Sequence, residues 1–244
     1  MESLYSTSVL GLSVYLILWL FFVYCFLGVL IEGVFGLVTD RTVELRLGLL
    51  YLPLRPIYGL GGVVSTLLAQ PFLQQPVVVF VIGVLVCSVV EFVASWFTES
   101  VFGTVSWDYS DKVWNVQGRI CLQYSVCWGV LALVAVYVLD RLLGVTQPAP
   151  RQPGETVLTV LVALALLSIV LTLAALARVR ERVDALRAEA RGEPVSVSDR
   201  PWAHLVGRLA PDPVLISSFP RMGLMAELKA LTGGQQSIVV HDLR

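Results

Sequence analysis

The sequence contains few charged residues. Asp, Glu, Lys and Arg make up 14% of its 244 residues, whereas a soluble domain carries about 25%. Hydrophobic residues make up 57%, and the mean hydropathy is +0.80. A globular protein of this size still needs a polar surface, so the deficit of charge indicates that lipid covers much of the molecule.

The signals of several enzyme classes are also missing. The sequence has no P-loop of the form G-x-x-x-x-G-K-[ST], no HExxH and no G-x-S-x-G. Both histidines, His204 and His241, lie far from every cysteine, so there is no zinc-type spacing. All four cysteines lie in or beside apolar segments and are interpreted as small core residues: Cys25, Cys87, Cys121 and Cys127. We therefore expect no metal or other cofactor, and a net charge of −1 argues against a nucleic-acid partner.

Five apolar segments are long enough, or nearly so, to cross a bilayer as helices, which takes about 20 residues. They cover residues 9–38, 56–74, 77–102, 119–143 and 156–177. These segments predict an all-α, polytopic transmembrane helix bundle of about five spans over residues 1–177. The composition changes afterwards, which predicts a cytoplasmic helical extension and tail over residues 178–244. Residues 195–244 contain two short helical patterns at most, and we expect the bundle to fold without the tail.

The fifth span continues into the tail as an amphipathic pattern. Apolar residues and one threonine repeat there at alternating spacings of three and four: Ile169, Thr172, Leu176, Val179, Val183, Leu186 and Ala190. This apolar seam predicts one long helix that ends at Gly192-Glu193-Pro194.

Basic residues are distributed unevenly around the predicted spans. If the N-terminus is outside, ten lie on the inside: Arg41, Arg46, Arg55, Lys112, Arg119, Arg178, Arg180, Arg182, Arg187 and Arg191. The outside segments contain two, Arg141 and Arg151. Because cytoplasmic loops are enriched in Lys and Arg, we expect the N-terminus outside and the C-terminus in the cytoplasm.

Glu32 and Glu91 are the acidic residues that lie deepest within the apolar segments. Glu32 is six residues from the end of the first segment, and Glu91 is well inside the third, where Ser88, Ser95 and Glu99 share its face. A carboxylate in mid-bilayer costs about 2.5–3.5 kcal/mol on insertion scales. Two compatible interpretations follow. The acids pair with Arg55 or Arg119 and lock the bundle together, or they form a substrate or ion site.

Polar residues are also concentrated in the segment between the third and fourth spans. Trp107-Asp108-Tyr109-Ser110 is followed by Trp114, Asn115 and Gly118-Arg119. This pattern favours an ordered, partly re-entrant loop that forms a plug on the cytoplasmic side, since irregular backbone survives at membrane depth only where protein or a water-filled cavity covers it. The alternative is that these residues merely cap the fourth helix.

The second span begins with a rigid turn, Pro53-Leu54-Arg55-Pro56, followed by Tyr58-Gly59. A helix N-terminus beside an arginine can bind an anion. The alternative, which we favour, is a close helix crossing, because one face of this span carries only small residues: Gly59, Gly62, Thr66 and Ala69.

The order of these motifs resembles a bacterial membrane-protein family described as putative ABC-transporter type IV. The matching elements are Glu32, the P-x-x-P-I-Y-G turn of Pro53–Gly59, the Glu91/Ser95/Glu99 triplet, W-D-Y-S at 107–110, N-x-x-G-R-I-C-L at 115–122, and Ser125 followed by Trp128-Gly129. The resemblance covers roughly residues 20–140 and includes neither the fifth helix nor the tail. It departs before Pro53, where the family has glycine and this chain has Leu52.

The resemblance implies a permease-like subunit in the bacterial cytoplasmic (inner) membrane, working with a separate ATPase subunit, with homo-oligomerisation left open. Ten residues are the candidates for binding a substrate: Glu32, Arg55, Tyr58, Glu91, Ser95, Glu99, Asp108, Tyr109, Asn115 and Arg119. Two other classes of function stay open. One is a membrane-embedded enzyme that uses Glu91 or Asp108 as a base on a lipid or isoprenoid, and the other is an adaptor or regulatory protein that recruits a partner through its tail.

The cost of burying charge also leads to a geometric prediction. We expect Glu91, Asp108 and Arg119 to meet in one desolvated cluster, because opposite charges held together recover much of their cost in lipid. Glu99, nearer the loop, is the substitute partner for Arg119 if Glu91 lies too deep.

Overall fold

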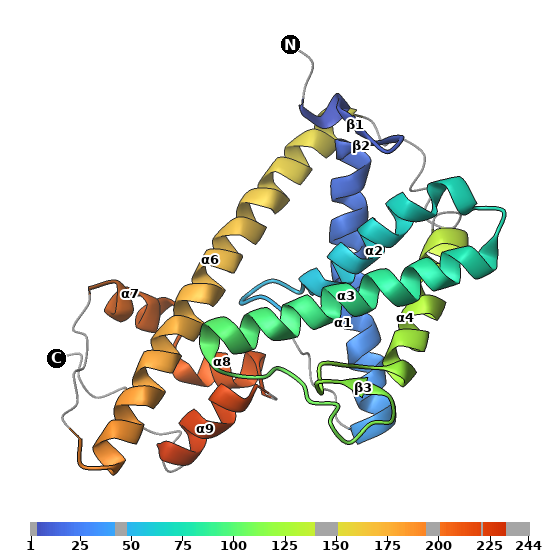
Figure 1. The fold of residues 1–244 in the computed structure, drawn as a ribbon. Helices are drawn as coiled ribbons and strands as arrows, with labels where there is room; N and C mark the ends of the chain where they lie inside the picture. The colour runs from blue at the N-terminus through green and yellow to red at the C-terminus, as the bar shows by residue number, and fades with distance from the viewer. Residues whose placement is uncertain (1–3, 42–47, 140–150, 194–200, 221, 233–244) are drawn as a thin grey trace.

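A computed structural model describes residues 4–41, 48–139, 151–193, 201–220 and 222–232, and this part of the chain is mainly helical (Figure 1). The main helices are α1 (Val14–Asp40), α2 (Pro56–Ala69), α3 (Pro76–Phe102), α4 (Leu122–Val134) and α6 (Arg151–Ala190). The tail contains α7 (Pro201–Leu209), α8 (Asp212–Ser218) and α9 (Gly223–Leu231). Short elements complete the described chain: η1 (Leu4–Ser6), β1 (Ser8–Val9), β2 (Leu12–Ser13), η2 (Gln70–Phe72), β3 (Asn115–Val116), β4 (Ile120–Cys121) and the π-helical turn η3 (Ala135–Leu139).

The prediction of an all-α transmembrane helix bundle is confirmed. Within the described residues, four helical stretches are long and apolar enough to cross a membrane: Val14–Val38, Pro76–Phe102, Leu122–Leu139 and Pro153–Ala190. Helix α2 is the fifth apolar helix, but its 14 residues extend only about 21 Å at 1.5 Å per residue. Because the hydrocarbon core of a bilayer is about 30 Å thick, α2 is short for a complete span.

Two predicted spans begin later than their apolar residues suggest. The first starts at Val14 because Ser8–Val9 pairs with Leu12–Ser13 in a hairpin, and Ser13 then caps the helix by accepting a hydrogen bond from the Leu16 N–H. The hairpin turn needs positive φ angles, which Leu10 (49°) and Gly11 (88°) adopt. The fourth span starts at Leu122, because Ile120–Cys121 is the second strand of another hairpin.

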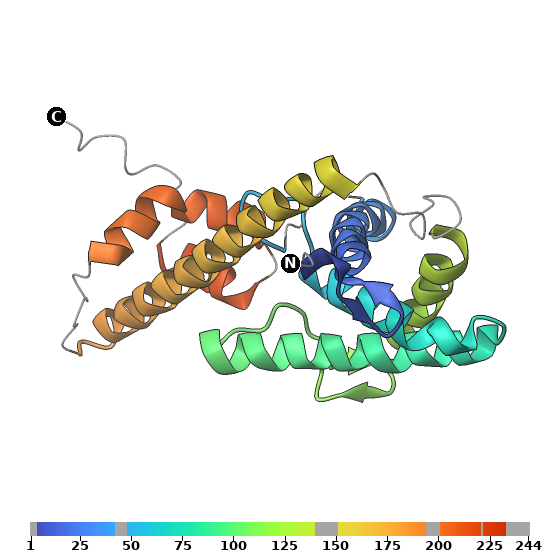
Figure 2. The same cartoon turned by 90° about the horizontal axis from the view of Figure 1, so that it is seen from above.

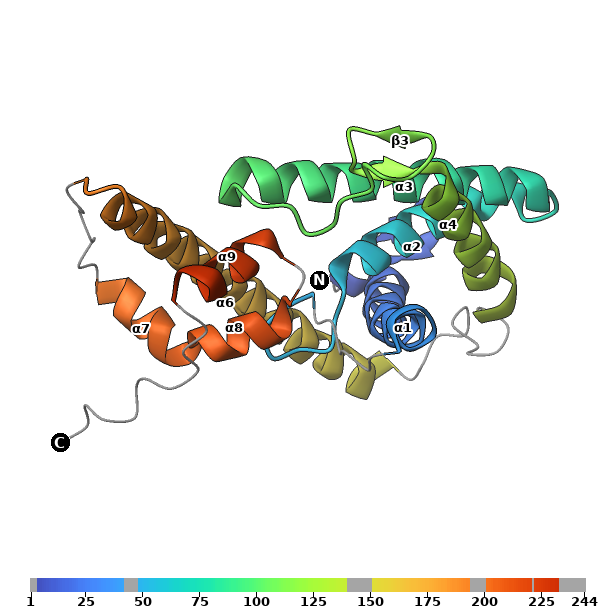
Figure 3. The same cartoon turned by 90° about the horizontal axis from the view of Figure 1, so that it is seen from below.

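Helices α1 to α4 form one packed unit, and Figures 2 and 3 show α1 nearly end-on beside α2 while α3 runs across them. The small residues of α2 let α1 approach closely. A Cβ atom added at Gly59 would lie 2.4 Å from the Cys25 sulfur, and one at Gly62 would lie 2.5 Å from the Tyr24 ring. The close helix crossing predicted for this face is therefore confirmed.

Helix α6 joins this unit to the tail. Its first half packs on α1, where Leu158 and Ala165 belong to one buried cluster with Tyr15 and Phe22. Its second half carries the predicted apolar seam, which the tail helices cover (Figure 1). The buried members of that cluster from α6 and the tail are Ala175, Leu176, Val179, Val183, Val206, Ala210, Leu215, Met222, Leu224, Met225 and Leu228. The described part of the tail thus has three short helices, where the sequence indicated at most two.

The tail also contacts the two loops that precede α2 and follow α3. Leu50 and Phe102 are buried in the cluster of α6 with the tail helices. The Tyr51 hydroxyl donates to the carbonyl of Leu209, 2.6 Å away. Thr104 accepts a hydrogen bond from the Leu224 N–H at 2.9 Å. Both loops and the tail therefore lie at the same end of α6.

Candidate functional site

Glu32 of α1, the first of the two deepest acids predicted from the sequence, has a basic partner. Nη1 of Arg55, just before α2, lies 3.0 Å from Glu32 Oε2, and the pair is about one-fifth exposed. This contact is an ion pair without a well-directed N–H, because Nη1 makes no hydrogen bond. The Tyr58 hydroxyl donates to Glu32 Oε1 at 3.1 Å. Arg55 is held by its backbone as well, since its N–H donates to the Cys25 carbonyl. The predicted ion pair between an acid and Arg55 is thus present.

The second acid, Glu91 of α3, is surrounded by neutral donors. It is 4% exposed, and each carboxylate oxygen accepts one hydrogen bond. The Tyr109 hydroxyl donates to Oε1 at 3.1 Å, and Trp128 Nε1 donates to Oε2 at 3.0 Å. Tyr109 comes from the loop after α3 and Trp128 from α4, so Glu91 connects three segments.

Aromatic rings link the two acids. The rings of Tyr58 and Trp128 have centroids 4.8 Å apart and are tilted by 59°. On the other side of Glu91, Tyr109 stacks on Tyr124 with centroids 4.8 Å apart. The resulting group of Glu32, Arg55, Tyr58, Glu91, Tyr109 and Trp128 is called the Glu32–Glu91 network below. It draws residues from α1, α2, α3, α4 and the loop between α3 and α4.

A small cavity lies against this network. Its volume is about 70 Å³, and Tyr58 and Trp128 form part of its wall. Cys87, one helical turn before Glu91, also lines it, together with apolar side chains of α1 and α4. Ser65 and Cys87, the small polar residues of the wall, contact each other at 3.7 Å. The cavity is therefore mainly apolar. The carboxylate of Glu91 lies behind its wall, hydrogen-bonded to the lining residue Trp128.

The loop between α3 and α4 is ordered through its own hydrogen bonds, as the re-entrant interpretation requires. The Asn115 side chain donates to the carbonyls of Ser110 and Lys112 and accepts from the Gly118 N–H. Gly118 has a φ of 67°, and an added Cβ would lie 2.7 Å from an Asp108 oxygen. The loop thus holds Tyr109 in place against Glu91.

Arg119 forms its ion pair with Glu99, the substitute partner, at 2.5 Å. The Arg119 guanidinium also lies 3.5 Å from the Ser95 hydroxyl and 5.7 Å from the centroid of the Phe92 ring. Glu99 is 47% exposed, whereas Arg119 is 15% exposed. This pair therefore sits at the edge of the bundle, where α3 meets the loop.

The prediction that Glu91, Asp108 and Arg119 form one cluster is wrong. Asp108 is exposed, and its Oδ1 accepts hydrogen bonds from the backbone and hydroxyl of Ser110. These bonds hold the pKa of Asp108 below its ordinary value. The physical reason is depth: Arg119 meets the outer acid of α3, Glu99, and the neutral side chains of Tyr109 and Trp128 reach the inner acid, Glu91.

Two residues of this region were not among the candidates from the sequence. Trp128 contacts both halves of the network, and Tyr124 stacks on Tyr109. A signal for Trp128 was present, because tryptophan prefers the membrane interface and this one lies within an apolar span. The indole N–H of a buried tryptophan needs an acceptor, and a carboxylate on the neighbouring span can supply it.

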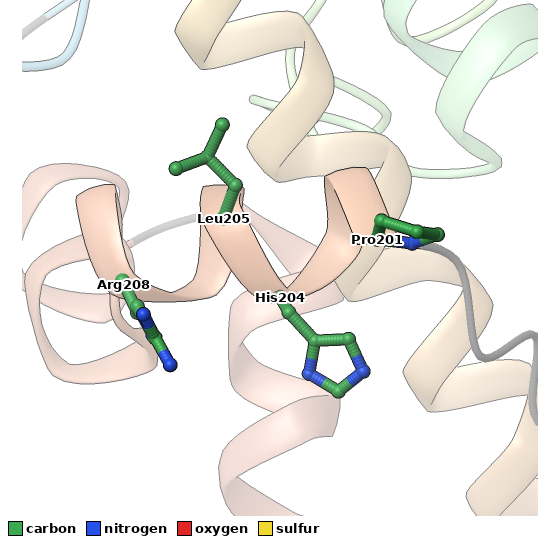
Figure 4. A pocket seen from close by; sticks show the side chains of 4 residues that line it. All are labelled: Pro201, His204, Leu205 and Arg208. Carbon is green, nitrogen blue, oxygen red and sulfur yellow. The ribbon is translucent and has the colours of Figure 1, made fainter.

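A second hollow lies on the tail and belongs to no such network. It is lined by four side chains of α7, Pro201, His204, Leu205 and Arg208, all of them exposed (Figure 4). The figure shows Leu205 pointing to one side of the helix and His204 and Arg208 to the other. Because one helix supplies the whole lining, this hollow is a surface depression.

Comparison with known proteins agrees with the resemblance seen in the motifs. The family model described as putative ABC-transporter type IV matches residues 19–173. The match extends into α6, so it reaches beyond the first four helices to which the motifs pointed, and it contains every residue of the Glu32–Glu91 network. No curated protein and no solved structure gives a significant match. Because the model covers more than half of the 244 residues, this membrane protein belongs to the putative ABC-transporter type IV family.

Proposed function

We propose that the chain is the permease-like membrane subunit of an ABC-type transporter and works with a separate ATPase subunit. The observation that carries this proposal is the Glu32–Glu91 network, which places two acids and an arginine between apolar helices. Charged groups inside membrane helices are costly, and they commonly mark substrate or ion pathways. Family membership agrees with this proposal.

Three of the sequence candidates have a different role in the proposal. Glu99 and Arg119 form an ion pair at the end of α3, and Asn115 organises the loop. We propose that these three residues position the loop, and through it Tyr109. Glu32, Arg55, Tyr58, Glu91, Tyr109 and Trp128 would then form the substrate pathway, with Ser95 buried beside it.

We also propose that the chain lies in a bacterial cytoplasmic membrane with its C-terminus in the cytoplasm. The contacts of the chain support the orientation expected from its charges. The loops before α2 and after α3 contact the tail, and those loops contain five of the ten inside basic residues. At the other end of α6, the Tyr5 hydroxyl lies 2.7 Å from Thr159 Oγ1. The N-terminal segment and the tail are thus at opposite ends of one long helix. Of the basic residues counted, Arg46 and Arg141 lie outside the described residues.

The two other classes of function have less support. As a candidate base, Asp108 is exposed in a turn and binds Ser110, and both oxygens of Glu91 already accept hydrogen bonds. An adaptor would recruit its partner through the tail, and much of the apolar surface of the tail helices is already buried against α6.

Co-purification from native membranes tests the transporter proposal. The full chain, tagged at its N-terminus, would be extracted in mild detergent and assayed for ATP hydrolysis, with an unrelated tagged multi-pass protein as the control. We expect a P-loop protein in comparable molar amount, together with ATPase activity that the control lacks. A chain that purifies intact without any such protein, even after chemical cross-linking in the membrane, would contradict the proposal.

A further inference from the structure

Glu91 is a buried carboxylate whose hydrogen-bond donors carry no positive charge. Its two oxygens accept from Tyr109 and Trp128. Among the described residues, the basic groups nearest in sequence pair with other acids: Arg55 with Glu32, Lys112 with Asp111 and Arg119 with Glu99. A buried carboxylate is expensive to ionise without an opposite charge, so a positively charged ligand would stabilise the ionised form of Glu91 better than the protein alone does.

The surroundings of Glu91 specify the kind of cation. Trp128 and Tyr58 stand together with ring centroids 4.8 Å apart, and aromatic faces, that of tryptophan most strongly, attract organic cations such as ammonium groups. A metal ion would need several oxygen, nitrogen or sulfur ligands. Within the described part of the chain, no group of three or more His, Cys, Asp or Glu residues could hold one.

The adjoining cavity sets the size of the ligand. It has a volume of about 70 Å³ and a mainly apolar wall that includes Tyr58, Cys87 and Trp128. One water molecule takes up about 30 Å³ in the liquid, so the cavity accepts an apolar group of only a few heavy atoms. Trp128 connects the two parts, because its ring lines the cavity while its N–H binds Glu91.

We infer that Glu91, Trp128 and Tyr58 form a binding site for a small organic cation, an ammonium group with a short apolar chain. The ammonium group replaces the Trp128 N–H as the donor to Glu91 Oε2 and rests against the two rings, and the chain fills the cavity. This inference rests on the proposed function and assigns the chemical class of the substrate.

Thermal unfolding of the purified full chain tests this site with defined probes. The probes are n-propylammonium chloride, uncharged 1-propanol and sodium chloride, each titrated at the same concentrations. Only n-propylammonium is expected to raise the unfolding temperature saturably. Glu91→Gln should abolish that rise, whereas the matched control Asp111→Asn, which alters a carboxylate that is 70% exposed, should keep it.

Two changes at Trp128 separate the ring from its N–H. Trp128→Phe keeps an aromatic face and frees Glu91 Oε2, so we expect binding of n-propylammonium to be retained. Trp128→Leu removes the face and should weaken binding by about tenfold. These variants decide the question even if Glu91→Gln does not fold.

Several results would overturn the inference: no response of the wild type to n-propylammonium, an equal response to 1-propanol or sodium chloride, or unchanged binding in Glu91→Gln. None of these results bears on the proposed association with an ATPase, because the co-purification experiment needs no ligand.

Discussion

Glu32, which is half-buried, and Glu91, which is buried, lie in the same bundle, but their carboxylates are paired in different ways. Glu32 has the guanidinium of Arg55 at 3.0 Å as well as a tyrosine hydroxyl. Glu91 has two neutral donors. One acid thus contributes to holding α1 and α2 together, and the other is available for a positively charged ligand. Substitutions at the two positions should therefore have different consequences.

Arg55→Met should destabilise the protein strongly, because it leaves Glu32 in the membrane region without its counter-charge. Breaking a buried pair costs about 3–5 kcal/mol, and the lower end applies here because the pair is about one-fifth exposed. The double substitution Glu32→Gln with Arg55→Met should cost less than the two single substitutions added together. Thermal unfolding of all four proteins in detergent gives this coupling, and strictly additive losses would show that the pair contributes nothing.

Two glycines of α1 offer a matched comparison of packing. A Cβ added at Gly28 would lie 2.4 Å from the Tyr58 ring, whereas one at Gly33 meets nothing within 4 Å. Gly28→Ala should therefore displace Tyr58 from Glu32 and cost about 1–3 kcal/mol, the usual range for overpacking. Gly33→Ala should be neutral or stabilise the helix by up to about 1 kcal/mol. Equal unfolding temperatures for the two variants would argue against close packing of α1 on α2.

At the scale of elements, the loop between α3 and α4 works as a small folded unit. Its strands pair Asn115 with Cys121 and Val116 with Ile120, and Trp107 Nε1 donates to the Arg119 carbonyl at 2.9 Å. This framework fixes the position of Tyr109, whose hydroxyl reaches Glu91. The loop therefore contributes a wall of the candidate site.

Asn115→Ala should loosen this loop, because the Asn115 side chain makes three hydrogen bonds within it. Each such bond contributes about 0.5–1.5 kcal/mol, so the three together contribute about 1.5–4.5 kcal/mol of local stability. We expect faster hydrogen exchange of the backbone amides of residues 107–118 by mass spectrometry. Val113→Ala, at a side chain that is 75% exposed, is the control and should leave exchange unchanged. Identical exchange in both variants would contradict an ordered loop.

The sequence predicted the elements of this fold better than their contacts. The length and apolarity of residues 77–102 were sufficient to predict α3, which starts one residue earlier, at Pro76. The seam through Val179 and Val183 predicted a buried face on α6, and both residues are buried. The start of α1 was missed because Val9 and Leu12 are apolar in a strand as well as in a helix. Periodicity cannot separate these two states over a few residues.

The partners of the acids could not be predicted in full for a related reason. Glu91 and Glu99 lie on one face of α3, so helical spacing alone leaves both within reach of a basic residue in the loop. Only the conformation of the loop decides that Arg119 meets Glu99 and that Tyr109 meets Glu91. The loop depends on positive φ angles at Trp114, Gln117 and Gly118, and of these three only glycine signals such an angle in a sequence.

At the scale of the whole molecule, α6 and the tail form a second core beside the bundle. Arg178 pairs with Asp212 at 2.5 Å, and the backbone N–H and C=O of Leu50 bind Thr172 and Ser168 of α6. From the sequence we expect the bundle to fold without the tail. Because Leu50 and Phe102 share a buried cluster with the tail, the structure leads us to the opposite expectation.

Truncation after Gly192 should therefore lower the unfolding temperature and reduce monodispersity, because it exposes Val179 and Val183, which are now 0% and 1% exposed. Burying an aliphatic side chain of this size is worth about 1.5–3 kcal/mol. A shorter truncation after residue 232, which removes only residues outside the described part, is the control. If both truncated proteins are as stable as the wild type, the bundle folds without the tail, as the sequence predicts.

The last prediction concerns the two ends of the chain. An even number of spans would leave both termini on the same side, so four long helices alone would predict a shared side. The contacts argue otherwise: Tyr5 lies beside Thr159 near the start of α6, and the loops before α2 and after α3 contact the tail at its other end. Helix α2, although short, must then cross the membrane away from the side of the tail, and α3 must cross back to it. Reporter fusions at residue 1 and residue 244 should accordingly locate the N-terminus outside and the C-terminus in the cytoplasm, and a fusion in the turn at Leu73 should report the outside. If both termini report the same side, α2 does not cross, and the five-span arrangement is wrong.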